Sequence, residues 1–168
     1  ANQVNTGAND FNGKTVRLMN DIDLNNEVWT PIGQLTEDGG IGNTFKGTFD
    51  GNGFTIKNLS VTVEDGAAGL FGTVQNCIEI KNLKIENANI ESNHYAGALV
   101  GFLQENGNYH GSTYYTVKVT DCEVNNVTVK VTPNQVNGSY DNGDKAGGLI
   151  GYAASDIDIT NCKVNNAN

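Results

Sequence analysis

The chain has 168 residues, a length typical of a single domain. Its formal net charge is −9, from 10 basic and 19 acidic residues, and Arg17 is its single arginine. This balance excludes the basic patch of a nucleic-acid-binding protein and disfavours binding to an anionic membrane surface. No run of about 18 apolar residues is present, so the sequence predicts no membrane insertion.

The N-terminal region, residues 1–55, is predicted to form a cap and the first coils of the fold. Residues 1–13 are polar, and residues 15–19 and 22–24 alternate as short strands do. Trp29 beside Pro31 suits a bulky plug over an open end, because terminal units of repeat proteins are atypical. The start lacks Met, and we expect a mature chain from which a signal or lipid anchor has been removed.

Residues 45–56 predict a strand, a turn at Asp50-Gly51-Asn52-Gly53, and a second strand. The whole chain is rich in turn residues, with 21 Gly and 26 Asn but 2 Pro. Gly and Asn tolerate left-handed backbone conformations better than other residues do. No long stretch has the period of a helix, so the composition indicates short strands joined by tight turns.

A glycine phrase occurs three times in the second part of the chain, residues 56–168. Its copies are Ala68-Gly69-Leu70-Phe71-Gly72, Ala96-Gly97-Ala98-Leu99-Val100-Gly101 and Ala146-Gly147-Gly148-Leu149-Ile150-Gly151. Such repeats are the signature of solenoids, propellers or arrays.

An alternating apolar phrase recurs beside the glycine phrase. Its four copies are Ile56-Lys57-Asn58-Leu59-Ser60-Val61, Ile80-Lys81-Asn82-Leu83-Lys84-Ile85, Val119-Thr120-Asp121-Cys122-Glu123-Val124 and Ile159-Thr160-Asn161-Cys162-Lys163-Val164. The Asn or Asp at its third position fits a bend, and the apolar sites after it fit a strand with one buried face. From Leu59 to Leu83 the chain advances 24 residues, which predicts a basic coil of about two dozen residues with longer gaps as insertions.

These patterns predict an all-β parallel β-helix, or β-solenoid, of stacked coils with loop insertions. Equivalent residues would lie above one another in ladders such as Leu59-Leu83-Cys122-Cys162 and Val61-Ile85-Val124-Val164. A propeller is disfavoured because its blades need more hairpin turns than the sequence offers. We expect one domain over residues 1–168, as a fragment of a longer chain.

The ordered motifs resemble those of GLUG-repeat proteins over roughly residues 14–167. The residues that carry the resemblance are Asn20-Asp21-Ile22-Asp23-Leu24, Trp29-Thr30-Pro31-Ile32-Gly33, residues 45–53, Ile56-Lys57-Asn58-Leu59, Gly69-Leu70-Phe71-Gly72 and Gly148-Leu149-Ile150-Gly151. The resemblance implies a right-handed β-solenoid in a secreted or surface-attached bacterial protein. It also implies relatives among adhesins and the non-catalytic repeat region of IgA-cleaving metallopeptidases.

Three cysteines are present. Cys122 and Cys162 stand where two other repeats have Leu59 and Leu83, which favours small buried thiols over a disulfide between stacked coils. Cys77 would be left unpaired. No Cys-x-x-Cys spacing exists, so a zinc site is disfavoured.

Residues with metal or catalytic potential are few. Asp21, Asp23 and Asn25 have the spacing of the first ligands of a calcium loop, but the Gly and Glu required later are missing, which favours solvated or turn-capping carboxylates. The residues Asp50-Gly51-Asn52-Gly53 likewise favour a turn over a cation site. His94 and His110 lie outside any HExxH motif, and no Gly-x-Ser-x-Gly motif occurs. We therefore predict no catalytic residues, no metal and no cofactor.

Two insertions, residues 104–115 and 130–145, hold most of the candidate binding residues. By repeat register, residues 91–95 lie at the same edge as the second insertion. Aromatic rings beside amides provide flat apolar area and directional hydrogen bonds, as sugar and protein sites do. The alternative is that these loops only cover the solenoid and that their tyrosine side chains pack against it. The candidates are His94, Tyr95, Tyr109, Tyr114, Tyr115 and Tyr140.

The sequence thus favours a non-catalytic, secreted or cell-surface β-solenoid module for adhesion or for the display of binding loops. Its expected partner is a glycan or protein on a host or neighbouring cell surface. A glycan-binding module of a carbohydrate-acquisition protein and the scaffold region of a larger surface peptidase are the alternatives.

Overall fold

The structure is a computed structural model that describes residues 1–35, 42–75, 79–104, 116–132, 135–136, 139–140, 143–154 and 156–168. Nearly all of its regular structure is β-strand, and every main sheet is parallel. The predicted all-β class with parallel strands is therefore confirmed. A short helix, α1 (Asn2–Asn5), precedes the strands and was not predicted.

Two large sheets run the length of the molecule. The five-stranded sheet has the order β1 (Thr15–Arg17), β3 (Thr48–Asp50), β8 (Glu79–Lys81), β12 (Val117–Thr120) and β18 (Ile157–Thr160). The six-stranded sheet comprises β2 (Ile22–Asp23), β4 (Thr55–Lys57), β9 (Lys84–Ser92), β13 (Glu123–Val131) and β19 (Lys163–Ala167), with β5 (Ser60–Val63) also paired to β9.

Two smaller sheets contain the glycine phrases. One consists of β6 (Ala67–Ala68), β10 (Tyr95–Gly97) and β16 (Lys145–Gly147). The other consists of β7 (Phe71–Val74), β11 (Val100–Leu103) and β17 (Ile150–Ala153). An antiparallel pair, β14 (Gln135–Val136) and β15 (Ser139–Tyr140), lies within the second insertion.

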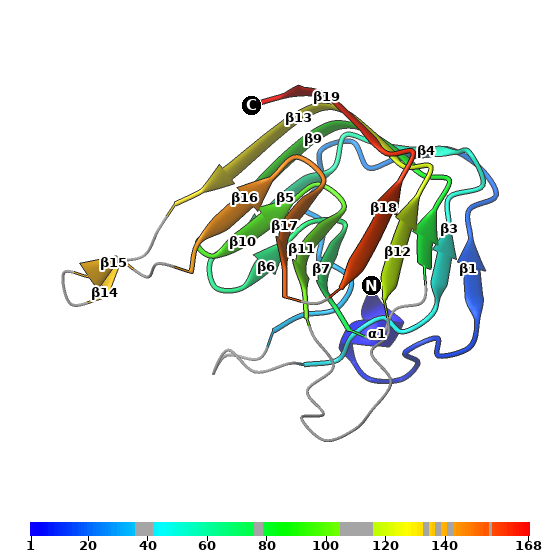
Figure 1. Ribbon diagram of the computed structural model, residues 1–168, viewed down its shortest axis with the longest axis horizontal. Coiled ribbons are helices and arrows are strands. Elements are labelled where there is room, and N and C mark those ends of the chain that lie inside the picture. Colours follow the sequence, from blue (N-terminus) through cyan, green and yellow to red (C-terminus); the bar gives the residue numbers. More distant parts are fainter. Residues whose placement is uncertain are drawn as a thin grey trace.

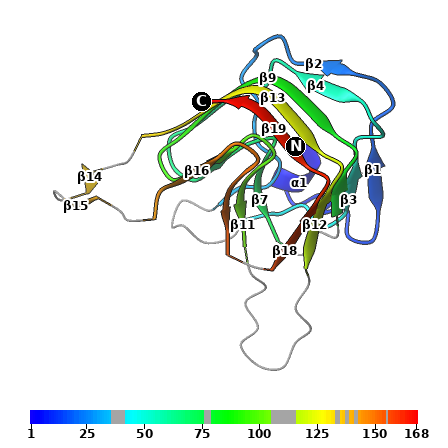
Figure 2. The same ribbon diagram turned by 45° about the horizontal axis from the view of Figure 1, so that its top comes forward.

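From β6 onward the chain visits the four parallel sheets in the same order on each of three passes, whereas β1 to β5 before them lie in the two large sheets only (Figures 1 and 2). It runs through β6, β7, β8 and β9, then β10 to β13, then β16 to β19, and each strand pairs with its counterpart from the previous pass. Apolar side chains from all four sheets form one buried cluster between them.

Asparagine residues and one aspartate bend the chain at two places in each pass. Asn82, Asp121 and Asn161 have positive φ angles of 53°, 53° and 52° at the junction of the five- and six-stranded sheets. A second series within the six-stranded sheet, Asn58, Asn87, Asn126 and Asn166, has φ angles between 52° and 56°. Asn adopts this left-handed conformation more readily than other residues with a Cβ atom, so the sequence marks each bend.

The glycine phrases lie where successive passes approach most closely. A Cβ atom added at Gly69 would overlap the carbonyl oxygen of Gly97, and one added at Gly97 would overlap the backbone nitrogen of Gly151. Larger residues would therefore push successive passes apart. Leu70 and Leu99, inside the same phrases, are fully buried in the core.

The N-terminal region covers one end of the core. Val4 of α1 is buried, and a group of phenylalanines fills this end, with ring centroids 5.3 Å (Phe49–Phe71) and 5.5 Å (Phe45–Phe71) apart. Trp29, predicted as a plug, packs against the core and donates a hydrogen bond from Nε1 to the Leu70 carbonyl at 3.1 Å.

The ladder prediction was right for the three passes from β6 to β19 and wrong for the strands before them, β4 and β5. Val124 pairs with both Ile85 and Val164, and the pairs on either side place Cys122 between Leu83 and Cys162. Val61, however, pairs with Ile90, so Leu59 lies at the position of Ala88 and not of Leu83.

This error arises because the pattern Ile-x-Asn occurs twice within one pass. Ile80-Lys81-Asn82 and Ile85-Glu86-Asn87 mark two successive bends, and Ile56-Lys57-Asn58 belongs to the second. From Ile56 to Ile85 the chain advances 29 residues (85 − 56), so the basic pass is longer than the predicted two dozen.

Candidate functional site

A group of aromatic rings lies at the corner between the two smaller sheets. Tyr95 of β10 stacks on Phe102 of β11 with centroids 4.8 Å apart and on Tyr152 of β17 at 5.4 Å. Phe102 and Tyr152 are register partners, and their rings stack nearly parallel, with an interplanar angle of 8°. Tyr95 and Tyr152 are half-buried, so this aromatic group reaches the surface.

Lys145 adds a positive charge to the aromatic group. Its Nζ atom lies 5.9 Å from the centroid of the Tyr152 ring, within the range of a cation–π contact. Lys145 is also the register partner of Tyr95, so the β10–β16 pairing places these two residues side by side.

His94 links two acidic residues next to this aromatic group. Its Nδ1 atom is 3.3 Å from Oδ1 of Asp144, and its Nε2 atom is 3.9 Å from Oδ1 of Asp65. The second carboxylate oxygen of Asp144 is buried and has no hydrogen-bond partner among the described atoms. The His94 ring centroid is 6.2 Å from that of Tyr95, so the polar and aromatic groups are neighbours.

The predicted placement of His94 and Tyr95 is confirmed. The Lys145 amide donates to the His94 carbonyl at 2.8 Å, and Glu91 is the register partner of Lys130, so residues 91–95 do lie at the edge of the second insertion. Their role in binding stays a prediction. Tyr109, Tyr114 and Tyr115 lie outside the described residues, as does His110. Tyr140 is part of β15, but its side chain lies outside the description.

Sequence reasoning missed Phe102 and Tyr152, which bring the cluster together with Tyr95. A signal was present, because both residues directly follow the last glycine of a glycine phrase, Gly101 or Gly151. Equivalent positions of a repeat lie side by side, so two aromatic residues at this position predict a stacked pair.

Of the acidic residues considered as calcium ligands, Asp23 caps a turn and Asp21 contacts the neighbouring part of the chain at Thr55. Oδ1 of Asp23 accepts hydrogen bonds from the Asn25 amide at 2.9 Å and from Nδ2 of Asn58 at 2.8 Å. These two bonds, the Asn25 amide first, lower the pKa of Asp23. Oδ1 of Asp21 accepts from the Thr55 amide at 2.8 Å. Within the described ranges, no group of three or more His, Cys, Asp or Glu side chains is arranged to hold a metal ion.

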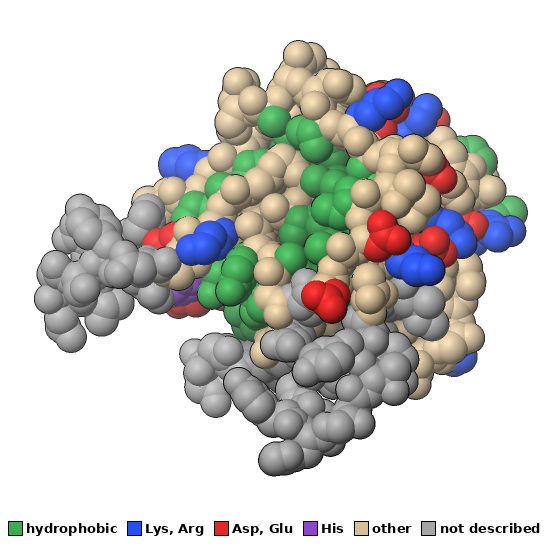
Figure 3. Space-filling view, in the orientation of Figure 1, with side chains coloured by type: hydrophobic (Ala, Val, Ile, Leu, Met, Phe, Trp, Pro, Cys, Tyr) green, Lys and Arg blue, Asp and Glu red, His purple; other side chains and the backbone are tan. Residues whose placement is uncertain are grey.

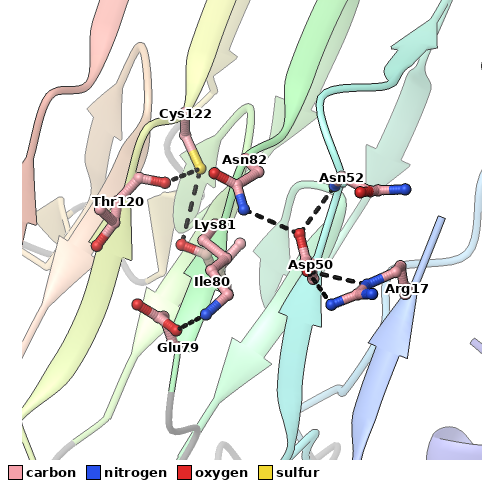
Figure 4. A network of polar contacts seen from close by, with 9 residues as sticks. All are labelled: Arg17, Asp50, Asn52, Glu79, Ile80, Lys81, Asn82, Thr120 and Cys122. Atoms are coloured by element: carbon pink, nitrogen blue, oxygen red, sulfur yellow. Dashed lines mark hydrogen bonds and ion pairs between the residues drawn. The ribbon is translucent and has the colours of Figure 1, made fainter.

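The buried Asp50 is the centre of a polar network that reaches the surface at Arg17 (Figure 4). Its carboxylate accepts hydrogen bonds from Nδ2 of Asn82 at 3.0 Å and from the Asn52 amide at 2.9 Å, and it forms a 2.9 Å ion pair with Arg17. The Asn82 bond is the main cause of a lowered pKa of Asp50, with the Asn52 and Arg17 contacts adding to it. The Asp50 turn therefore ties three neighbouring strands together.

The two described cysteines are free thiols at adjacent register positions. Sγ of Cys122 donates to the Thr120 carbonyl at 3.4 Å and that of Cys162 to the Val119 carbonyl at 3.3 Å. Burial raises the pKa of the Cys122 thiol to about 12, so it stays protonated and unreactive. The equivalence with Leu83 predicted free, buried thiols; Cys122 is buried as expected, whereas Cys162 is only partly buried. Cys77 lies outside the described residues.

Residues 145–168, which contain the third glycine phrase and the fourth apolar phrase, match the family model of the GLUG motif. The chain carries a GLUG repeat. It is also 35% identical over 128 residues to halomucin of Haloquadratum walsbyi. That match covers 75% of this chain and 1% of halomucin, so the chain spans a very small part of its relative. No solved structure matches the chain significantly. Among the described residues, no helix is long and apolar enough to cross a bilayer.

Proposed function

We propose that this protein is a non-catalytic repeat module of a secreted or cell-surface protein, built as a right-handed parallel β-helix that displays loops for adhesion. The observation that carries the proposal is that the GLUG match, residues 145–168, coincides with one structural unit, β16 to β19. A unit that recurs along the chain extends the molecule and positions its insertions without requiring a reaction site.

The β-helix assignment is supported by the sheet order. Three passes visit the four sheets in one sequence, and each strand pairs in parallel with its counterpart. Crossover connections between parallel strands are right-handed in nearly all proteins, which favours a right-handed winding. The similarity to halomucin supports the surface or secreted location and a non-enzymatic role.

Bead retention tests the adhesion role. Beads coated with the full chain would be washed over a glycan array and over a panel of bacterial and animal cell surfaces. We expect retention on at least one surface. A variant in which a short Gly-Ser linker replaces residues 105–115 would release the beads while keeping the same β-sheet circular dichroism. Retention equal to that of uncoated beads on every surface would contradict the proposal.

A glycan-binding role is the second candidate, favoured by the surface that combines Tyr95, Tyr152, His94 and Asp144. Aromatic rings beside a carboxylate and an imidazole match the apolar face and the hydroxyl groups of a sugar. Tyr152→Ala would abolish array binding if this surface is the site. Lys118→Ala, an exposed change on the five-stranded sheet, is the matched control. No observation among the described residues favours the third alternative, the scaffold of a surface peptidase.

A further inference from the structure

The last pass, β16 to β19, leaves an apolar end face uncovered. Among the strands that the structure describes, each of these is the outermost of its sheet and is paired on one side only. The exposed fraction of apolar side chains rises from the covered pass to the last one. Val119 is 0% exposed and its register partner Ile159 is 49% exposed, while Val124 is 1% exposed and its partner Val164 is 41% exposed. Figure 3 shows hydrophobic side chains gathered in the middle of the face where β16 to β19 lie in Figure 1.

Unpaired strand edges beside apolar side chains form a surface ready to pair with another strand. The same face, one pass earlier, is the interface on which β16 to β19 themselves pack. The uncovered face therefore continues an interface that already exists within the molecule.

Charged side chains follow a rule across that internal interface. Wherever two charged residues are register partners on neighbouring described strands, their signs are opposite. The series are Arg17–Asp50–Lys81, Asp23–Lys57–Glu86, Glu79–Lys118–Asp158, Lys84–Glu123–Lys163 and Glu91–Lys130. Three of these pairs are direct ion pairs, Arg17–Asp50 at 2.9 Å, Lys57–Glu86 at 3.9 Å and Lys130–Glu91 at 2.6 Å.

This rule is informative because acidic residues outnumber basic ones by 19 to 10, so like-charged partners would be common in a random register. Opposite charges on directly facing residues stabilise a strand pair, and like charges destabilise it. The alternating charges thus specify which strand position faces which, in addition to the apolar ladders.

We propose that the end face of β16 to β19 docks a further coil of the same repeat, running parallel to these strands, with a basic residue opposite Asp158 and an acidic residue opposite Lys163. The proposal rests on the β-helix arrangement proposed above. Asp158 and Lys163 are the exposed ends of two series of alternating charge. A residue of opposite charge facing each of them in a further coil would continue the alternation.

A second copy of the chain fits this face less well. A two-fold axis would reverse every strand and the order of the sheets around the coil, so the four edges could not all pair together. Head-to-tail stacking is blocked because the other edge of β7 is already bridged by Ile32 and Phe45.

The register allows a direct test by extension of the chain. Ala167 pairs with Val127, so Asn168 lies opposite Thr128, which in turn pairs with Asn89. Appending a copy of residues 90–128 after Asn168 therefore continues the winding and places copies of Lys118 and Glu123 opposite Asp158 and Lys163. Appending a copy of residues 129–168 instead places Asp opposite Asp158 and Lys opposite Lys163.

We expect the 90–128 extension to slow amide hydrogen exchange in β18 and β19 on the order of 100-fold. The 129–168 extension should protect these amides much less. When the appended copy of residues 129–168 carries Asp158→Lys and Lys163→Glu, the protection of these amides should be restored. In 1 M salt, where the Debye length falls to about 3 Å, the difference between the two extensions should shrink.

Three results would overturn the proposal. One is proteolytic trimming of both extensions back to Asn168, with unchanged exchange in β18 and β19. Another is equal protection by the two extensions at low salt, which would remove the role of the charges. The third is a dimer of the unextended chain, by light scattering, that Ile159→Asp with Val164→Asp converts to monomer, because the occupant would then be a second copy. Loss of adhesion in the bead assay would leave each of these results unchanged, so the two proposals fail separately.

Discussion

Val124 and Val164 are identical side chains at the same register position in consecutive passes. Truncating each of them therefore compares the stability contribution of a covered valine with that of a partly exposed one. Val124 is 1% exposed because β19 covers it, whereas Val164 is 41% exposed. Replacing either residue by Ala removes two carbon atoms. Transfer of these atoms accounts for about 1.6 kcal/mol when they are fully buried, and the cavity left behind brings the cost to roughly 2 kcal/mol.

Val164→Ala should cost roughly 1 kcal/mol, because part of its side chain is already in water and the lost volume opens to solvent. At about 2–4 °C per kcal/mol for a chain of this size, Val124→Ala should lower Tm by about 4–8 °C and Val164→Ala by about 2–4 °C. Urea denaturation followed by circular dichroism measures both free energies of unfolding. Equal losses in the two variants would refute the assigned register and the exposure of the last pass.

Three further predictions concern the bends, the polar network and the thiols. Asn87→Ala should cost about 1–2 kcal/mol in urea denaturation because its φ is 55°, whereas Asn87→Gly should cost less. Since the Asn82 bond lowers the pKa of Asp50 in the folded state, Asp50 stabilises the fold above its unfolded pKa and loses this contribution as pH falls below about 4. Asp50→Asn should flatten the dependence of Tm on pH in that range, and an unchanged slope would contradict the assignment. Peptide mapping after iodoacetamide at pH 8 should find Cys162 alkylated well before Cys122, whose thiol pKa is raised to about 12 by burial; equal rates would contradict this order.

Much of the fold could be predicted because its rules are local. The alternation in residues 119–124 and 159–164 predicted strands, and the Asn or Asp inside each phrase predicted bends that the structure places at positive φ. The glycine phrases predicted repeated units, which the structure explains by the close approach of Gly69 to Gly97.

Residues 56–61 could not be aligned from local pattern because two successive bends of the following pass carry the same Ile-x-Asn signal. Only pairing across the sheets, Ile56 with Ile85 and Val61 with Ile90, distinguishes them. The aromatic group posed a similar difficulty, since Tyr95 contacts Phe102 and Tyr152 through three strands separated along the chain.

The sequence by itself determined strands, bends, a repeated glycine phrase and the acidic net charge, because each depends on the conformational preference or charge of individual residues. The tertiary structure alone decided that Ile56 pairs with Ile85 and Val61 with Ile90. It alone also brought together the aromatic surface, the His94–Asp144 contact and the alternation of charge along the coils. The physical reason is that a parallel pair obtains its hydrogen bonds from backbone atoms common to every residue. Register is therefore chosen by the collective fit of side chains across passes, which no single stretch of sequence contains.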